Sequence, residues 1–90
     1  MTAPRVVLLV WEDAHTESEG PWVWQVDAKP LTPKIFHQVG FLLEDTPECV
    51  VLTSAMEPNA SGLMAARERI PRGMVRSITD LAPARKGRAR

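Results

Sequence analysis

Two apolar runs separated by a short polar break constrain the fold of this chain more than any other feature. The runs lie in residues 34–43 and 49–56, and the break between them reads EDTPE, residues 44–48. Pro47 fixes its own φ, and the side chains of Asp45 and Thr46 can bond to nearby backbone groups, as turn residues do. The pattern predicts a β-hairpin whose two strands are joined by a turn of about four or five residues.

The first strand of this hairpin has two unequal faces, because alternate side chains of a strand point in opposite directions. The odd-numbered set is the more apolar, and we expect it to face the core: Ile35, His37, Val39, Phe41 and Leu43. Gly40 in mid-strand predicts a bulge or a sharp bend. A bent central strand is what a small closed barrel needs.

The N-terminal third of the chain contains two further candidate strands. Residues 5–11 are apolar on both faces, which is typical of a covered strand, and we expect Trp11 in the core. Residues 22–26 predict a short second strand, with Trp22, Trp24 and Val26 on one face and Val23 and Gln25 on the other. A polar, acidic loop at residues 12–21 precedes it, and a connection with two prolines follows at residues 27–33.

In the C-terminal third, the sequence pattern fits more than one kind of secondary structure. Residues 63–69 fit either a helical turn or an edge strand, and residues 70–73 predict a turn with proline at its second position. Residues 74–81 have helical spacing of apolar positions, yet they contain β-branched side chains, and we favour a last strand.

Together these segments predict a mainly β chain of about five strands, arranged as a small SH3-like or Sm-like antiparallel barrel. The alternative is an antiparallel sheet with a C-terminal helix packed on it. Ninety residues are enough for one domain. We expect that domain to occupy residues 1–82 and residues 83–90 to form a basic, flexible tail.

The chain shows no targeting or membrane signal. No apolar run approaches the roughly 20 residues of a membrane helix, and the run at residues 6–11 is too short for a signal-peptide core. A single cysteine cannot form an internal disulfide, which agrees with a reducing compartment. These features predict a cytoplasmic protein with no membrane partner.

Charge is balanced over the whole chain but unevenly distributed along it. Residues 1–66 hold three basic and nine acidic side chains, whereas residues 67–90 hold eight basic and two acidic ones. The basic region can bind an anionic partner. Alternatively, the opposite charges can hold the two halves of the chain, or two copies of it, together.

Three short patterns resemble small uncharacterised proteins of tailed bacteriophages and prophages. They are Trp-x-Asp-Ala at residues 11–14, Val-Gly-Phe-Leu at residues 39–42, and Ile-Pro-x-Gly-x-Val-x-x-Ile at residues 70–78. The resemblance covers about residues 5–81. It implies a phage or mobile-element origin and the cytoplasm of a bacterial host cell, and it brings no catalytic residue with it.

An acidic cluster surrounds the first histidine and is the candidate metal site. Glu12, Asp13, His15, Glu17 and Glu19 carry side chains that can bind a divalent cation. Their spacing matches no established metal motif, and a solvated acidic loop explains them equally well.

No catalytic constellation accompanies the other reactive residues. His37 lies on the expected core face, where a histidine bonded to backbone is commoner than a general base. Cys49 has Glu48 beside it and no basic neighbour in sequence that would activate a thiolate. We therefore expect no catalytic residue and no cofactor.

Two tryptophans and a basic C-terminal region are the candidate binding residues. Trp22 and Trp24 can stack on a base or hold a peptide if their face is exposed, and otherwise they fill the core. The basic residues can contact phosphates, or they can solubilise the tail and pair with the acidic half. The basic set is Arg67, Arg69, Arg72, Arg76, Arg85, Lys86, Arg88 and Arg90.

The leading functional prediction is a non-enzymatic interaction module that binds a protein of the host or phage, or associates with itself. Open strand edges and a modest core favour that interpretation. Nucleic-acid binding through the basic end is the first alternative. Small-ligand or metal binding at residues 12–15 is the second.

Overall fold

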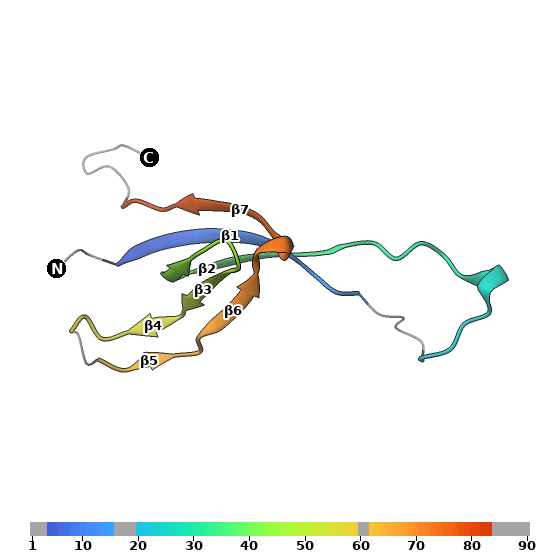
Figure 1. The fold of residues 1–90 in the computed structure, drawn as a ribbon, viewed down its shortest axis with the longest axis horizontal. Helices are drawn as coiled ribbons and strands as arrows, with labels where there is room; N and C mark the ends of the chain where they lie inside the picture. The colour runs from blue at the N-terminus through green and yellow to red at the C-terminus, as the bar shows by residue number, and fades with distance from the viewer. Residues whose placement is uncertain (1–3, 16–19, 60–61, 84–90) are drawn as a thin grey trace, which may run out of the picture.

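The computed structural model of the chain describes residues 4–15, 20–59 and 62–83. Within these ranges the chain is mainly β, with no α-helix. Five strands form one antiparallel sheet in the order β6-β3-β2-β1-β7 (Figure 1). Their bounds are β1 (Arg5–Asp13), β2 (Lys34–Asp45), β3 (Cys49–Thr53), β6 (Glu68–Pro71) and β7 (Val75–Asp80). A small separate hairpin consists of β4 (Ala55–Met56) and β5 (Met64–Ala65).

The predicted hairpin is confirmed, and so are the first and last strands. β2 and β3 pair antiparallel around a turn at residues 46–48. The undecided segment at residues 63–69 contributes β5 and the start of β6, and residues 72–74 form the short 3-10 turn η2 (Arg72–Met74). The alternative with a C-terminal helix is wrong for residues 62–83. The predicted strand at residues 22–26 is also wrong, because that segment pairs with nothing and ends in the 3-10 turn η1 (Gln25–Asp27).

The expectation for the two faces of β2 is reversed in the structure. Before the bulge, the even-numbered residues from Phe36 to Leu42 face the core, and the odd-numbered residues from Ile35 to Phe41 lie on the opposite side. Gly40 stands opposite the buried Val7 of β1, and a Cβ on Gly40 would lie 3.1 Å from the carbonyl oxygen of Thr53 and 3.4 Å from the Cβ of Leu52. Glycine is therefore needed for close approach to β3, and the bulge occurs instead between Leu42 and Glu44.

The core lies on the concave face of the sheet. Its fully buried residues come from β1, β3 and β6, and four partly buried side chains from β1, β2 and β7 pack against them. The buried set is Val7, Leu9, Val50, Leu52 and Ile70, and the flanking set is Trp11, Leu42, Val75 and Ile78. The expectation that Trp11 belongs to the core is thus confirmed in part, since its indole is half-buried at the rim.

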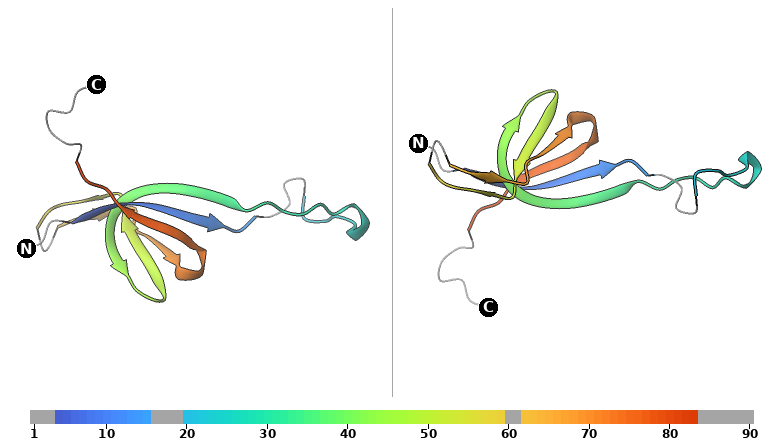
Figure 2. Two further views of the ribbon diagram at one scale, coloured as in Figure 1. Left: turned by 90° about the horizontal axis from the view of Figure 1, so that it is seen from above. Right: turned by 90° about the horizontal axis from the view of Figure 1, so that it is seen from below.

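The sheet is strongly curled but does not close, so the predicted closed barrel is wrong. β6 and β7 are the two ends of the sheet order and do not pair. They are joined only by η2, whose chain length allows the ends to be at most about 15 Å apart. A flat five-stranded sheet would separate its edge strands by about 19 Å. The sheet must therefore curl at the η2 end, as the curved strands show when seen from above and from below (Figure 2), and the strands fan apart away from η2 in the view of Figure 1.

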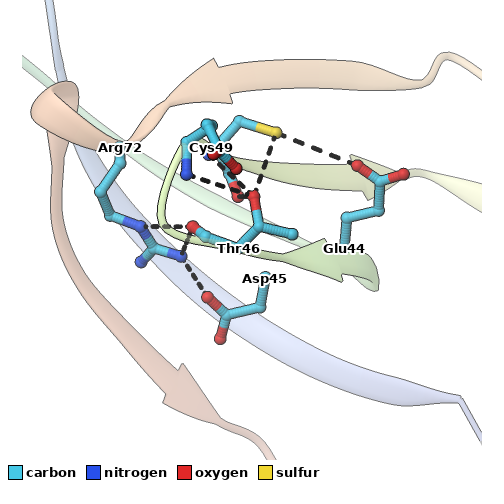
Figure 3. A network of polar contacts seen from close by, with 6 residues as sticks. Glu44, Asp45, Thr46, Cys49 and Arg72 are labelled. Carbon is cyan, nitrogen blue, oxygen red and sulfur yellow. Dashed lines mark hydrogen bonds and ion pairs between the residues drawn. The ribbon is translucent and has the colours of Figure 1, made fainter.

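Arg72 in η2 fastens this curled end to the turn between β2 and β3 (Figure 3). Its guanidinium donates to the carbonyl oxygen of Thr46 and pairs with the carboxylate of Asp45. Its backbone N–H donates to the carbonyl of Glu48 at 2.9 Å. These contacts hold η2 against β3 and thereby fix where β6 ends and β7 begins.

Candidate functional site

The segment between β1 and β2 leaves the sheet and projects from the body of the molecule (Figures 1 and 2). We call residues 20–33 the arm. Every residue of the arm is exposed. Pro21, Pro30 and Pro33 lack the N–H groups that a strand would donate. The arm is ordered locally by η1, in which the N–H of Asp27 donates to the carbonyl of Trp24 at 2.9 Å.

Large apolar side chains crowd the distal part of the arm. Trp22 is 91% exposed, Trp24 is 81% exposed and Val26 is 91% exposed. Trp22, Val23 and Trp24 line a shallow pocket of about 370 Å³. Soluble monomers rarely leave contiguous apolar surface in water, and such surface marks interaction sites. The arm is therefore the strongest candidate binding element in the described part of the chain.

The root of the arm is fixed to the concave face by aromatic and polar contacts. The rings of Trp11 in β1 and Phe36 in β2 lie 5.2 Å apart, centroid to centroid. The indole Nε1 of Trp11 donates to Oε1 of Gln38, and Nε2 of Gln38 donates to Glu68 of β6 at 2.6 Å. This chain of bonds spans β1, β2 and β6. The strand ends from which the arm projects are therefore fixed in position.

A second apolar surface lies on the side of β1 and β2 that faces away from the core. We call it the outer face. Cross-strand pairs place Val6 beside Phe41 and Leu8 beside Val39. None of these four side chains is buried, and Val39 is 58% exposed. The apolar members of the outer face are Val6, Leu8, Val10, Ile35, Val39 and Phe41.

Sequence reasoning missed the outer face because it assigned these odd-numbered β2 residues to the core. A usable signal was present in β1, whose run at residues 6–11 is apolar on both sides. One such side faces the core, and the other requires a second cover. His37 lies on the outer face opposite Val10 and is exposed. The expectation that His37 lies on the core face is therefore wrong.

The acidic residues near His15 are engaged in separate contacts. Glu12 forms an ion pair with Arg76 of β7, and Oδ1 of Asp13 accepts from the N–H of Ala14 at 2.8 Å. The Nδ1 of His15 donates to the carbonyl oxygen of Thr32 at 2.7 Å, which joins the chain just after β1 to the arm. Glu17 and Glu19 lie outside the described residues. Among residues 4–15, 20–59 and 62–83, no group of three or more His, Cys, Asp or Glu side chains is placed to hold a metal ion.

The four arginines of the basic set that the structure describes do not form one surface with the tryptophans. Arg72 binds Asp45 and Thr46 at the turn between β2 and β3, and Arg76 pairs with Glu12. Arg67 and Arg69 are exposed beside β3 and β6, in a hollow that they share with Glu44 and Glu68. Arg85, Lys86, Arg88 and Arg90 lie outside the described residues.

Cys49 is buried and held at the start of β3. Its Sγ lies 3.8 Å from Oγ1 of Thr46 and 3.9 Å from a carboxylate oxygen of Glu44 (Figure 3). Buried cysteines that serve a structural role are chemically inert. The surroundings of Cys49 are thus those of a structural residue.

Comparison of the chain with protein-family models, with curated proteins and with solved structures finds no match. The part of the chain that the structure describes contains no helix with the length and hydropathy to cross a membrane.

Proposed function

We propose that this chain is a non-enzymatic interaction module that uses the arm to bind a protein surface, either on a different protein or on another copy of itself. The observation that carries the proposal is the pair of almost fully exposed indoles, Trp22 and Trp24, on a segment that projects from the sheet. Burying a large apolar side chain is worth about 1.5–3 kcal/mol. Aromatic side chains of this kind dominate the energy of protein interfaces.

We further propose that the chain is an SH3-like module of the phage or prophage type that acts in the bacterial cytoplasm. In the five-stranded sheet the last strand, β7, pairs with the first, and η2 separates it from β6. This order supports an SH3-like arrangement that is open between β6 and β7. The three patterns that resemble small phage proteins support this proposed origin, and all three lie largely in strands of the sheet.

Affinity capture with matched variants tests the proposal. The tagged chain, the double variant Trp22→Ala with Trp24→Ala, and the control variant Leu63→Ala are each incubated with lysate and with untagged chain. Leu63 is a suitable control because it is 78% exposed and lies outside the arm. We expect proteins retained by the parent chain and by the control to be lost from the double variant. Identical retention by all three chains would remove the arm as the binding element.

Nucleic-acid binding is the second candidate, and it depends on Arg67 and Arg69. Both are exposed, and neither forms an ion pair within the described ranges. Phosphate contacts by these side chains would give an affinity that falls steeply with salt. Binding of single- and double-stranded oligonucleotides, measured from low to physiological salt, tests this candidate. It requires that Arg67→Ala with Arg69→Ala weakens binding and lowers the salt dependence.

A further inference from the structure

We infer that two copies of this chain exchange arms, each arm lying on the outer face of the other copy. The inference rests on the proposed function, because it names the surface that the arm binds. The arm and the outer face are two large apolar surfaces that the described part of the chain leaves in water. A single partner of the same sequence covers both.

The outer face has the composition of a surface that is covered in the assembled state. Its central pairs, Val6 with Phe41 and Leu8 with Val39, carry no charge. An antiparallel sheet that stands alone normally has one apolar and one polar face. The two faces of β1 and β2 both carry mainly apolar side chains. One face packs into the core, and we expect a partner to cover the other.

The arm is long enough to lie along most of this face. The six residues between η1 and β2, residues 28–33, span at most about 20–22 Å when extended. The nine residues of β1 cover about 31 Å. The arm continues in the direction of β1 and β2 beyond the sheet (Figure 1). A two-fold axis near the root of the arm therefore places the arm of each copy along the strands of the other.

The area involved reaches that of a stable dimer. Each tryptophan buries about 150–250 Å², so Trp22 and Trp24 remove roughly 300–500 Å² per arm from water. A reciprocal exchange buries two arms and an equal area on two faces, roughly 1,200–2,000 Å² in all, which is the range of specific protein interfaces. A two-fold exchange also closes on itself, so it yields a dimer and not a chain of copies.

Sedimentation of the full chain over a range of concentrations tests the exchange. We expect the parent chain to form a dimer, and we expect the dissociation constant to rise at least about 100-fold in two separate variants. One is Trp22→Ser with Trp24→Ser on the arm, and the other is Val39→Glu on the outer face. The control Leu63→Ser should leave the dimer unchanged. A parent chain that sediments as a monomer at every concentration overturns the inference.

Mixing the two variants shows whether a loss of dimer reflects the contact or a failure to fold. The Val39→Glu chain keeps intact arms, and the Trp22→Ser, Trp24→Ser chain keeps an intact outer face. An equimolar mixture should therefore form a heterodimer through one arm and one face, although each variant alone is monomeric. No heterodimer from two variants that retain the circular dichroism spectrum of the parent would refute reciprocal exchange.

Disulfide capture identifies the surface directly. A tagged chain carrying Val26→Cys is mixed with an untagged chain carrying Val39→Cys, and the buried Cys49 is left in place. We expect a cross-linked heterodimer in much higher yield than from Val26→Cys mixed with Leu63→Cys. Equal yields would overturn the inference. The proposed function has its own test in the capture experiment. It fails only if, in addition, the variant Trp22→Ala with Trp24→Ala still captures every protein of other sequence that the parent chain captures.

Discussion

The side chain of Arg72 donates two hydrogen bonds to the carbonyl oxygen of Thr46, from Nε at 3.0 Å and from Nη2 at 2.7 Å. The two residues belong to η2 and to the turn between β2 and β3, so the bonds join segments that are distant along the chain. They explain how an open sheet stays curled without pairing β6 to β7. The curl in turn covers the core and leaves the outer face of β1 and β2 in water.

Replacing Arg72 by alanine should therefore destabilise the fold. Hydrogen bonds to a charged group contribute about 1.5–3 kcal/mol, and the partial exposure of Arg72 and Asp45 lowers the ion-pair share. We expect Arg72→Ala to lower the free energy of unfolding by about 1–2 kcal/mol in urea titrations. The matched control Arg69→Ala, on an exposed side chain without an ion pair in the described part of the chain, should change it by less than about 0.5 kcal/mol. Equal effects of both substitutions would contradict the role given to Arg72.

Gly40 offers a second test, which asks whether glycine is required at this position because a larger side chain would not fit. A Cβ at this position would press on the carbonyl oxygen of Thr53 and on Leu52. We expect Gly40→Ala to cost about 1–3 kcal/mol, as overpacking of a core does. A Cβ added to Gly73 would meet no atom within 4 Å, so Gly73→Ala should be neutral or slightly stabilising. Thermal unfolding followed by circular dichroism distinguishes the two, and a tolerated Gly40→Ala would contradict the close approach of β2 and β3.

Gln38 links Trp11 to Glu68 across the concave face, and the link should show coupling. Removing Gln38 leaves the Trp11 N–H and the Glu68 carboxylate without this partner. We expect Gln38→Ala to cost about 1 kcal/mol. In a double-mutant cycle with Glu68→Ala, the two substitutions should be less than additive, by about 0.5 kcal/mol or more. Strict additivity would mean that the bridge contributes nothing to stability.

The strands of the sheet could be predicted from the sequence wherever a local pattern decides them. The hairpin of β2 and β3 follows from two apolar runs around a turn, and β1 follows from a continuous apolar run. The faces of β2 could not be predicted, because counting apolar residues ignores the close approach at Gly40 and the hydrogen bond that lets Gln38 face inward. Both depend on residues distant in sequence.

The candidate site was only half predictable for a related reason. The sequence predicts Trp22 and Trp24 to be either binding residues or core residues, since two indoles on one face of a strand fit both alternatives. A strand exists only if another strand pairs with it, and the prolines on either side of this segment keep it out of the sheet. The burial of the indoles therefore depends on which strands pair with each other. A local sequence pattern does not give that information.

The last prediction concerns the contrast between the arm and the core. Trp22 and Trp24 are exposed and do not belong to the core cluster, whereas Trp11 packs against it. In a Val39→Glu background, which we expect to be monomeric, Trp22→Ala with Trp24→Ala should change the free energy of unfolding by less than about 0.5 kcal/mol. Trp11→Ala in the same background should cost about 2–3 kcal/mol, less than for a fully buried tryptophan. Urea unfolding followed by circular dichroism measures both changes. If the arm variant lost as much stability as the Trp11 variant, the two exposed indoles would be structural residues and not binding residues.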